Sequence, residues 1–247
     1  MKLLSIGNSF SEDAHGYLYD LFKSVGEDVY LVNACIPGCT LEMHWNSLIH
    51  NEENYLYQFK GVTTKENAVL RDILTSEKWD VITLQQVSHY SGKYETYQPF
   101  LADLYCEIKA ICPNAKFYIH KTWAYEHDFV SSNFEMYNND QKYMYKCLCD
   151  ASNKAAESIG ADIIPAGDVI QYLRENTKAF DYKNGGLSFN RDGFHLTLDY
   201  GRYAASLCWC CKILGIDAFD VKFTPDGCSD EKLVIIKNAV NTLLKGE

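Results

Sequence analysis

The stretch Lys2–Ser11, KLLSIGNSFS, runs from a short apolar segment directly into a turn that carries two serines. Its first part, Lys2–Ile6, is short, rich in aliphatic residues and followed by a glycine, which is typical of a buried β-strand. Gly7 lets the backbone turn sharply, and the polar residues after it suit the first turn of a helix. The stretch therefore predicts a strand, a tight turn and a helix in immediate succession, as in α/β proteins.

Four later apolar runs have the same character, and we expect strands at Asp28–Ala34, Asp80–Leu84, Lys116–His120 and Asp162–Pro165. Helical patterns lie between and after them, over about 12–25, 65–77, 94–110, 136–159, 167–178, 197–213 and 229–244. Strands that alternate with helices form parallel sheets covered on both faces. We therefore expect an α/β fold, a three-layer α/β/α sandwich around a flavodoxin-like, doubly wound sheet of about five parallel strands.

The length of 247 residues and the hydrophobic content of 47% suit one large domain, and no linker or repeat divides the chain. We expect residues 1–247 to form a single domain. Two polar stretches rich in aromatic residues, 41–64 and 122–129, are expected to be excursions over the carboxyl edge of the sheet. Ligands of open α/β sheets bind beyond that edge.

The composition argues against several classes of partner. A formal net charge of −10 disfavours nucleic acids and anionic membranes. No stretch reaches the roughly 18 apolar residues of a membrane span, and the first apolar run, of about five residues, is too short for a signal peptide. The ten cysteines lack the spacing of a disulfide-rich domain. The histidines are scattered, and no pair has the i, i+4 spacing of a helical zinc site with a third ligand in view. We expect a cytoplasmic protein with reduced thiols; its oligomeric state stays open.

Ser9 and the sequence Asp192-Gly-Phe-His195 contain the side chains needed for acyl transfer: a nucleophile, a base and a group that orients the base. Each has a simpler explanation when taken alone. Ser9 or Ser11 could be a helix N-cap, and Asp-x-x-His could be an ordinary loop pair. The two motifs lie after the first and the last strand, however, and a doubly wound sheet brings both places to its carboxyl edge. This placement favours catalysis.

These motifs resemble sequence blocks of the SGNH/GDSL hydrolase superfamily. Gly7–Ser11 is similar to the first block, with Asn8 in place of the usual aspartate, and Asp192–Leu196 is similar to the last block. Gly38, in the turn after the second strand, resembles the glycine of the second block. The resemblance covers nearly the whole chain in order and spacing, and it implies the same fold and a catalytic triad.

The resemblance also implies an oxyanion hole that includes the backbone N–H groups of Ser9 and Gly38. The third block differs: the superfamily has Gly-x-Asn-Asp after the third strand, whereas this chain has Leu84–Ser88, LQQVS. Because a glutamine amide donates a hydrogen bond as asparagine does, Gln85 or Gln86 is expected to be the third donor. Neighbouring side chains on a strand point to opposite faces, so we expect only one of them to do so and favour Gln85.

The LQQxS block and the sequence TWAY at 122–125 are similar to an uncharacterised bacterial branch of the superfamily. Aromatic residues on segments that leave the carboxyl edge could form a platform for sugar rings or could simply pack under long loops. These residues are Trp45, Tyr90, Tyr94, Trp123 and Tyr125. We assign five residues to substrate binding: Asn8, Trp45, Ser88, Trp123 and Tyr125.

The sequence therefore predicts a serine esterase in which Ser9 attacks the ester, His195 accepts its proton and Asp192 orients the imidazole. The expected substrate is a small-molecule or carbohydrate ester with a small acyl group, such as acetyl, and no metal or organic cofactor is expected. Two alternatives remain: a non-catalytic carbohydrate-binding protein, and a thioesterase or lysophospholipase. Among the other histidines, His120 lies in an apolar strand and is expected to be a core residue.

Overall fold

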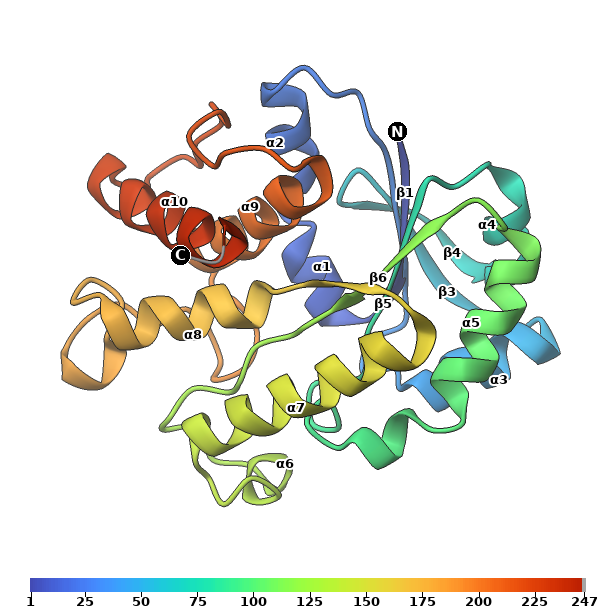
Figure 1. The fold of residues 1–247 in the computed structure, drawn as a ribbon, viewed down its shortest axis with the longest axis horizontal. Helices are drawn as coiled ribbons and strands as arrows, with labels where there is room; N and C mark the ends of the chain where they lie inside the picture. Colours follow the sequence, from blue (N-terminus) through green and yellow to red (C-terminus); the bar gives the residue numbers. More distant parts are fainter. Residues whose placement is uncertain (246–247) are drawn as a thin grey trace.

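A seven-stranded sheet runs through the centre of the computed structural model, which describes residues 1–245 (Figure 1). The strand order is β4-β3-β2-β1-β5-β6-β7. The five predicted strands are present and parallel, at Lys2–Gly7 (β1), Tyr30–Cys35 (β2), Val81–Leu84 (β5), Lys116–His120 (β6) and Asp162–Ile164 (β7). From β1 the chain adds strands first on one side and then on the other, so β1 ends at the topological switch point.

Helices cover both faces of the sheet, which confirms the predicted three-layer α/β/α sandwich (Figure 1). One layer contains α1 (Ser9–Ala14), α2 (Leu18–Ser24), α8 (Ala166–Asn176), α9 (Tyr200–Leu214) and α10 (Asp230–Lys245). The other contains α3 (Leu41–His50), α4 (Leu70–Ser76), α5 (Phe100–Ile111) and α7 (Gln141–Ile159). Side chains of β1 alternate between the two cores, with Leu3 in the first and Leu4 and Ile6 in the second.

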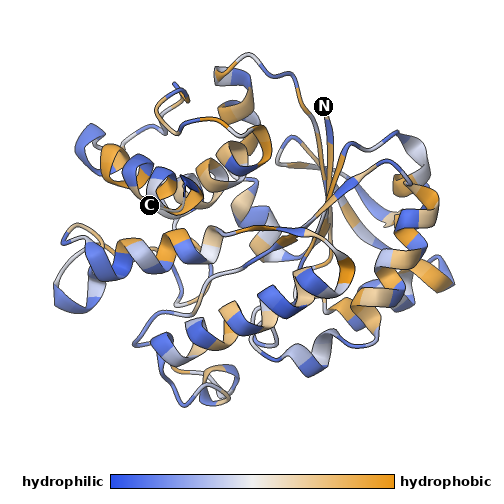
Figure 2. Cartoon of the chain, in the orientation of Figure 1, coloured by the Kyte–Doolittle hydropathy of each residue, from blue (hydrophilic) through white to orange (hydrophobic). Residues whose placement is uncertain are grey.

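The hydropathy pattern follows this layering. Figure 2 shows hydrophobic residues along the central strands and mostly hydrophilic ones on the outer sides of the helices that cover them. Cys208, Cys210 and Cys211 of α9 are all buried in the first of these cores. No helix within residues 1–245 is long and apolar enough to cross a membrane.

The stretch 41–64 is not an excursion, and the prediction of a helix from residue 65 was wrong at its start. After α3, the strands β3 (Glu53–Phe59) and β4 (Val62–Val69) form an antiparallel hairpin that extends the sheet beyond β2. Both turn residues, Lys60 and Gly61, have positive φ, as a tight hairpin turn requires. Strand β4 is largely exposed at the sheet edge, so its polar sequence lacks the apolar signal of a buried strand.

Several predicted helices are divided. The helix expected at 12–25 is two helices, because the chain turns at His15–Tyr17 between α1 and α2. A 3₁₀ turn at Tyr94–Tyr97 precedes α5, and a short helix, α6 (Ser132–Glu135), precedes α7. A second 3₁₀ turn lies at Tyr182–Asn184. These interruptions leave the helical layers in place.

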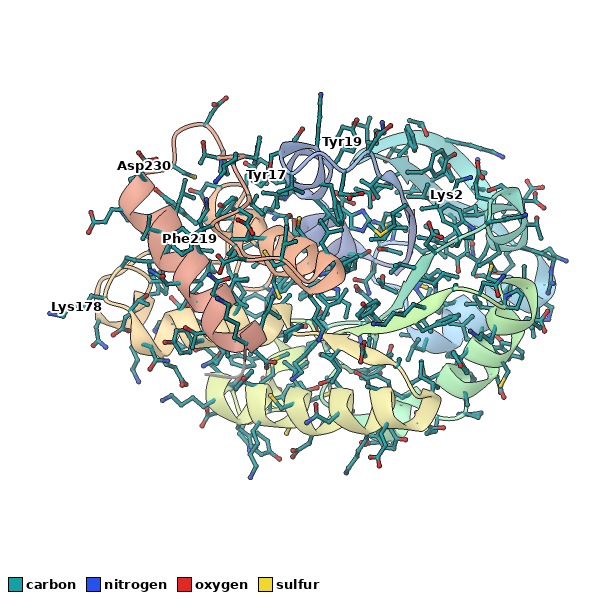
Figure 3. The ribbon with its side chains drawn as sticks, turned by 45° about the horizontal axis from the view of Figure 1, so that its top comes forward. Lys2, Tyr17, Tyr19, Lys178, Phe219 and Asp230 are labelled. Carbon is teal, nitrogen blue, oxygen red and sulfur yellow. The ribbon has the colours of Figure 1, made fainter. Side chains whose placement is uncertain are left out.

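The start of α2 is attached to the C-terminal part of the chain. Tyr17, labelled in Figure 3, donates from its hydroxyl to the Leu198 carbonyl at 2.6 Å, and its ring lies 5.5 Å from that of Phe223. Nearby, Ser206 of α9 donates to the Ala14 carbonyl at 2.8 Å. These contacts bring the first turn-and-helix unit of the chain against the segment that follows β7.

Candidate active site

The turn after β1 places Ser9 at the first position of α1. The N-cap is Asn8, whose Oδ1 accepts from the Phe10 N–H at 3.0 Å and whose Nδ2 donates to the Cys39 carbonyl at 3.0 Å. Neither serine is therefore the N-cap, and the helix begins about three residues before the predicted start at residue 12. Ser11 is buried, and its hydroxyl lies 2.7 Å from the Asn8 carbonyl, to which it donates. The Ser9 hydroxyl is left to face the cavity at this edge.

Ser9, His195 and Asp192 form a continuous hydrogen-bonded chain. His195 Nε2 lies 2.9 Å from Ser9 Oγ, and His195 Nδ1 lies 2.7 Å from Asp192 Oδ2. An ionised carboxylate only accepts, so the proton on the imidazole belongs on Nδ1. Nε2 then presents a lone pair to the Ser9 hydroxyl, which is the arrangement of a serine nucleophile and its base.

The Asp192 carboxylate is held by its own loop. Its Oδ1 accepts from the backbone N–H of His195 at 2.8 Å and of Phe194 at 3.2 Å. Partial burial alone would raise the pKa of Asp192, but the hydrogen bonds from His195 and Phe194 outweigh it and lower that pKa below its usual range. Asp192 is therefore an anion at neutral pH. Gly193, the residue between Asp192 and Phe194, has φ +90°. A Cβ at this position would lie 2.2 Å from the Phe129 ring, so only glycine fits.

Ser9 and His195 open into a cavity of about 420 Å³. Much of its wall is aromatic, from Phe10, Tyr125, Phe129 and Phe194. None of the described residues that line it is an aspartate, glutamate, lysine or arginine. The cavity thus combines the hydrogen-bonded Ser9–His195 pair with a mainly apolar wall.

Gly38 lines the same cavity, in the turn after β2, and has φ +67°. Within residues 1–245, neither the Gly38 N–H nor the Ser9 N–H has a protein acceptor. Ser9 occupies the first position of α1, where the backbone N–H has no partner within the helix. Two backbone donors at this edge of the sheet are therefore free to bind an anionic oxygen.

The third block does not bring a glutamine into the cavity, and neither Gln85 nor Gln86 lines it. Gln85 donates from Nε2 to Asn8 Oδ1 at 2.7 Å, and its Oε1 lies 2.7 Å from His120 Nδ1. Gln86 accepts at Oε1 from the Leu41 N–H at 3.0 Å and donates from Nε2 to the Thr96 carbonyl at 2.9 Å. Both amides are thus engaged in the scaffold around the site.

The model of a family described as "Domain of unknown function (DUF4886)" matches residues 2–243 of this chain. The chain belongs to this DUF4886 family. A crystal structure of a DUF4886 family protein from Bacteroides uniformis has 32% sequence identity and a TM-score of 0.91, over 100% of this chain and 95% of that one.

More distant structures share the fold of the DUF4886 chain. A protein proposed to be an SGNH hydrolase, from Slackia heliotrinireducens, has 22% identity and a TM-score of 0.58, over 85% of this chain and 97% of that one. An acetyl xylan esterase, AlAXEase, has 16% identity and a TM-score of 0.54, over 85% of this chain and 98% of that one. At these identities the likeness establishes the fold. No protein among those with curated descriptions matches the sequence.

The aromatic residues predicted to bind substrate in the DUF4886 chain divide into two groups. Tyr125 lines the cavity with Ser88, and their hydroxyl oxygens lie 2.9 Å apart; Asn8 lines it as well. Trp123 is fully buried, with its ring stacked on Phe10 at 4.4 Å. Trp45 of α3 packs against the second core and does not line the cavity. The packing alternative therefore holds for both tryptophans.

Sequence reasoning missed several residues of the DUF4886 cavity. Phe10 and Phe194 line it, although the sequence analysis assigned neither of them a role in the site. Their position next to Ser9 and His195 in sequence was a usable signal. Val87, which follows the two glutamines, lines the cavity, and Phe129 reaches it from the second predicted excursion. No local pattern marks these last two.

His120 is a core histidine, as predicted. It is buried in β6, and burial lowers its pKa to about 3, with the proximity of His15 adding to the effect. The described part of the DUF4886 chain contains no group of three or more histidine, cysteine, aspartate or glutamate residues that could hold a metal ion.

Proposed function

We propose that this chain is a serine hydrolase that cleaves ester bonds. The observation that carries the proposal is the continuous Ser9–His195–Asp192 chain, with distances of 2.9 Å and 2.7 Å, at the wall of a cavity. The resemblance of the sequence blocks and the shared fold of known esterases support it. Fold alone does not determine chemistry, so the proposal depends on the geometry of these side chains.

In the proposed reaction, Ser9 Oγ attacks the ester carbonyl carbon while His195 Nε2 accepts the hydroxyl proton. Asp192 stabilises the imidazolium that forms. Collapse of the tetrahedral intermediate breaks the bond to the alcohol oxygen, and His195 returns the proton to the departing alcohol. Water then attacks the acyl-Ser9 ester with His195 again acting as base, which releases the acid and restores the enzyme.

The oxyanion of the intermediate is bound, in this proposal, by the backbone N–H groups of Ser9 and Gly38. Two backbone donors of this kind suffice in other serine hydrolases. Since both glutamine amides are engaged elsewhere, we do not assign the third donor to Gln85 or Gln86. Loss of one donor typically costs about 10²–10³ in rate, so a hole with two donors is compatible with catalysis.

We propose a neutral ester with a small acyl group, such as an acetylated carbohydrate, as substrate. The described lining contains no lysine or arginine to pair with a phosphate, which disfavours lysophospholipids and phosphate-bearing thioesters. The aromatic side chains of Tyr125, Phe129 and Phe194 suit the apolar face of a sugar ring. Acetyl xylan and acetyl-xylooligosaccharide esterases are among the proteins that share the fold.

The alternative, a carbohydrate-binding protein without catalysis, is favoured by one observation, the engagement of both Gln85 and Gln86 in the scaffold instead of the cavity. An intact nucleophile, base and orienting carboxylate argue against it. The discriminating experiment is active-site labelling with a fluorophosphonate probe, combined with hydrolysis of p-nitrophenyl acetate.

We expect the wild-type protein to gain one phosphonyl group at Ser9 and to hydrolyse p-nitrophenyl acetate. Ser9→Ala should abolish both. Ser11→Ala is the matched control, because this serine lies two residues after Ser9 in the same helix, is buried, and is bound to the Asn8 carbonyl rather than to His195. It should lose about 1 kcal/mol of stability and keep its activity. A folded wild-type protein that neither labels nor hydrolyses would overturn the esterase proposal and favour the binding protein.

A further inference from the structure

A single buried carboxylate links the helix that carries Ser9 to the loop that carries Asp192 and His195. Asp13 lies four residues after Ser9, on the same helix α1, and is 1% exposed. Its Oδ2 accepts from the backbone N–H of Leu196, the residue directly after His195, at 2.8 Å. Ser9 and the proposed base are thus connected by a second route that does not pass through their own hydrogen bond.

Two arginines complete the attachment. Arg191, which directly precedes Asp192, donates to Asp13 Oδ1 at 3.0 Å and also to the Leu196 carbonyl. Arg202 of α9 donates from Nε to Asp13 Oδ1 at 2.9 Å. Helices α1 and α9 lie side by side in Figure 1. Asp13 of α1 is buried and pairs with Arg202 of α9.

The loop itself is closed where Asp13 binds it. Arg191 donates from its backbone N–H to the His195 carbonyl at 2.9 Å, and Asn190 and Leu196 form an isolated antiparallel bridge. The Asp192–His195 contact lies within this closed loop. The loop therefore carries its acid and base as one unit, and its position relative to Ser9 depends on contacts outside the unit.

We propose that Asp13 is a positioning residue that sets the distance between Ser9 Oγ and His195 Nε2. The inference rests on the proposed esterase function. Asp13 is bound by three residues of the loop and α9, and it moves with Ser9 because the two residues share a six-residue helix. A charged acceptor that is buried and bound by several donors holds its partners far more firmly than an exposed ion pair.

The test is Asp13→Asn, which keeps the size of the side chain. An asparagine presents one oxygen and an NH₂ group, so at least one of the donors that face it loses its acceptor. We expect the loop to shift relative to α1. Misplacement of reacting groups by about 1 Å costs on the order of 10²-fold in rate, so kcat for p-nitrophenyl acetate should fall about 10²-fold. KM should change little, because Asp13 does not line the cavity. The rate of fluorophosphonate labelling at Ser9 should fall in parallel.

Asp168→Asn is the matched control for a merely structural effect. Asp168 is a largely buried carboxylate that binds Lys121 Nζ at 2.9 Å and Tyr145 at 2.8 Å, away from the cavity. Its loss should lower Tm without lowering kcat at a temperature where the protein is fully folded. The same readouts on Asp13→Asn then separate positioning from stability.

Arg191→Gln keeps the test informative if Asp13→Asn does not fold, since the Arg191 side chain is 36% exposed. This variant removes the Arg191–Asp13 ion pair and keeps the hydrogen bond from the Leu196 N–H to Asp13. A smaller fall in kcat, of about tenfold, is therefore expected. The inference is overturned if the wild type is active and the folded Asp13 or Arg191 variants keep full kcat. An inactive, unlabelled wild type would instead refute the proposed function.

Discussion

The segments that carry the proposed triad and the segment at the end of β5 are both short sequence blocks at the same edge of the sheet, yet their side chains go to different places. Ser9 and His195 meet at 2.9 Å and face the cavity. Gln85 and Gln86 point into the scaffold, and Val87 and Ser88 line the cavity in their stead.

The two regions differ in whether the hydrogen-bond partners lie close together in the sequence. The Asp192–His195 pair is closed within four residues, so its geometry depends mainly on the turn that holds it. Gln85, by contrast, joins Asn8 to the buried His120, and these partners come from the end of β1 and from β6. Buried polar groups need hydrogen-bond partners. Asn8 and His120 therefore bind the Gln85 amide, which we had expected to bind the oxyanion.

The largest effect should come from the triad side. Asp192→Asn keeps the shape of the side chain but offers an NH₂ donor to the imidazole, so the His195 proton moves to Nε2. The imidazole then cannot accept the Ser9 proton, and we expect kcat to fall by about 10³–10⁴-fold, with KM nearly unchanged. Steady-state kinetics with p-nitrophenyl acetate measure both. Wild-type kcat in this variant would mean that Asp192 has no role in orienting the base.

Replacement of the glutamines should produce an intermediate effect of another kind. Gln85→Leu leaves the His120 Nδ1–H without its acceptor and removes one of the two donors to Asn8 Oδ1. We expect the free energy of unfolding to fall by about 1–3 kcal/mol. The change in kcat should stay well below the 10²-fold typical of a lost oxyanion donor. Urea denaturation and kcat, measured on the same preparation, separate the two effects.

Gln86→Leu should behave in the same way, since the backbone N–H of Leu41 and of Val87 would lose their acceptor. A 10²-fold loss of kcat in either glutamine variant, with stability unchanged, would place that amide in the reaction after all and remove the contrast drawn above.

The last effect concerns acid stability rather than kcat. Burial lowers the pKa of His120 to about 3, and burial does the same to His15 and His44. Between about pH 6.5 and pH 3, the unfolded chain binds protons at these histidines that the folded chain does not. Stability due to their neutral state is therefore complete above about pH 6.5 and declines as the pH falls through this window, by up to about 1.4 kcal/mol per pH unit for each histidine.

Thermal denaturation from about pH 7 to pH 5 checks this expectation. His120→Gln should start from a lower Tm at neutral pH but lose less on acidification, because one of the three histidines is gone. Parallel curves of Tm against pH for the variant and the wild type would contradict the assignment of acid sensitivity to the buried histidines.

Much of the site could be predicted because its signals are local. The strand–turn–helix unit around Ser9 and the spacing between Asp192 and His195 are visible in adjacent residues, and the structure brings all three together. The strands β3 and β4 were missed since β4 is a polar edge strand without a buried face. Trp123 was assigned to substrate because an indole ring suits sugars and cores equally well, and here it is completely buried.

The sequence by itself determined the alternation of strands and helices, the five parallel strands, and the residues of the proposed nucleophile and base. These follow from apolar periodicity, turn residues and spacings of a few positions. Only the tertiary structure decided that Ser9 and His195, 186 positions apart, form a hydrogen bond. It also decided which aromatic rings reach the cavity and where Gln85 and Gln86 bind. Those outcomes depend on competition among distant donors and acceptors for buried partners, which no local pattern records.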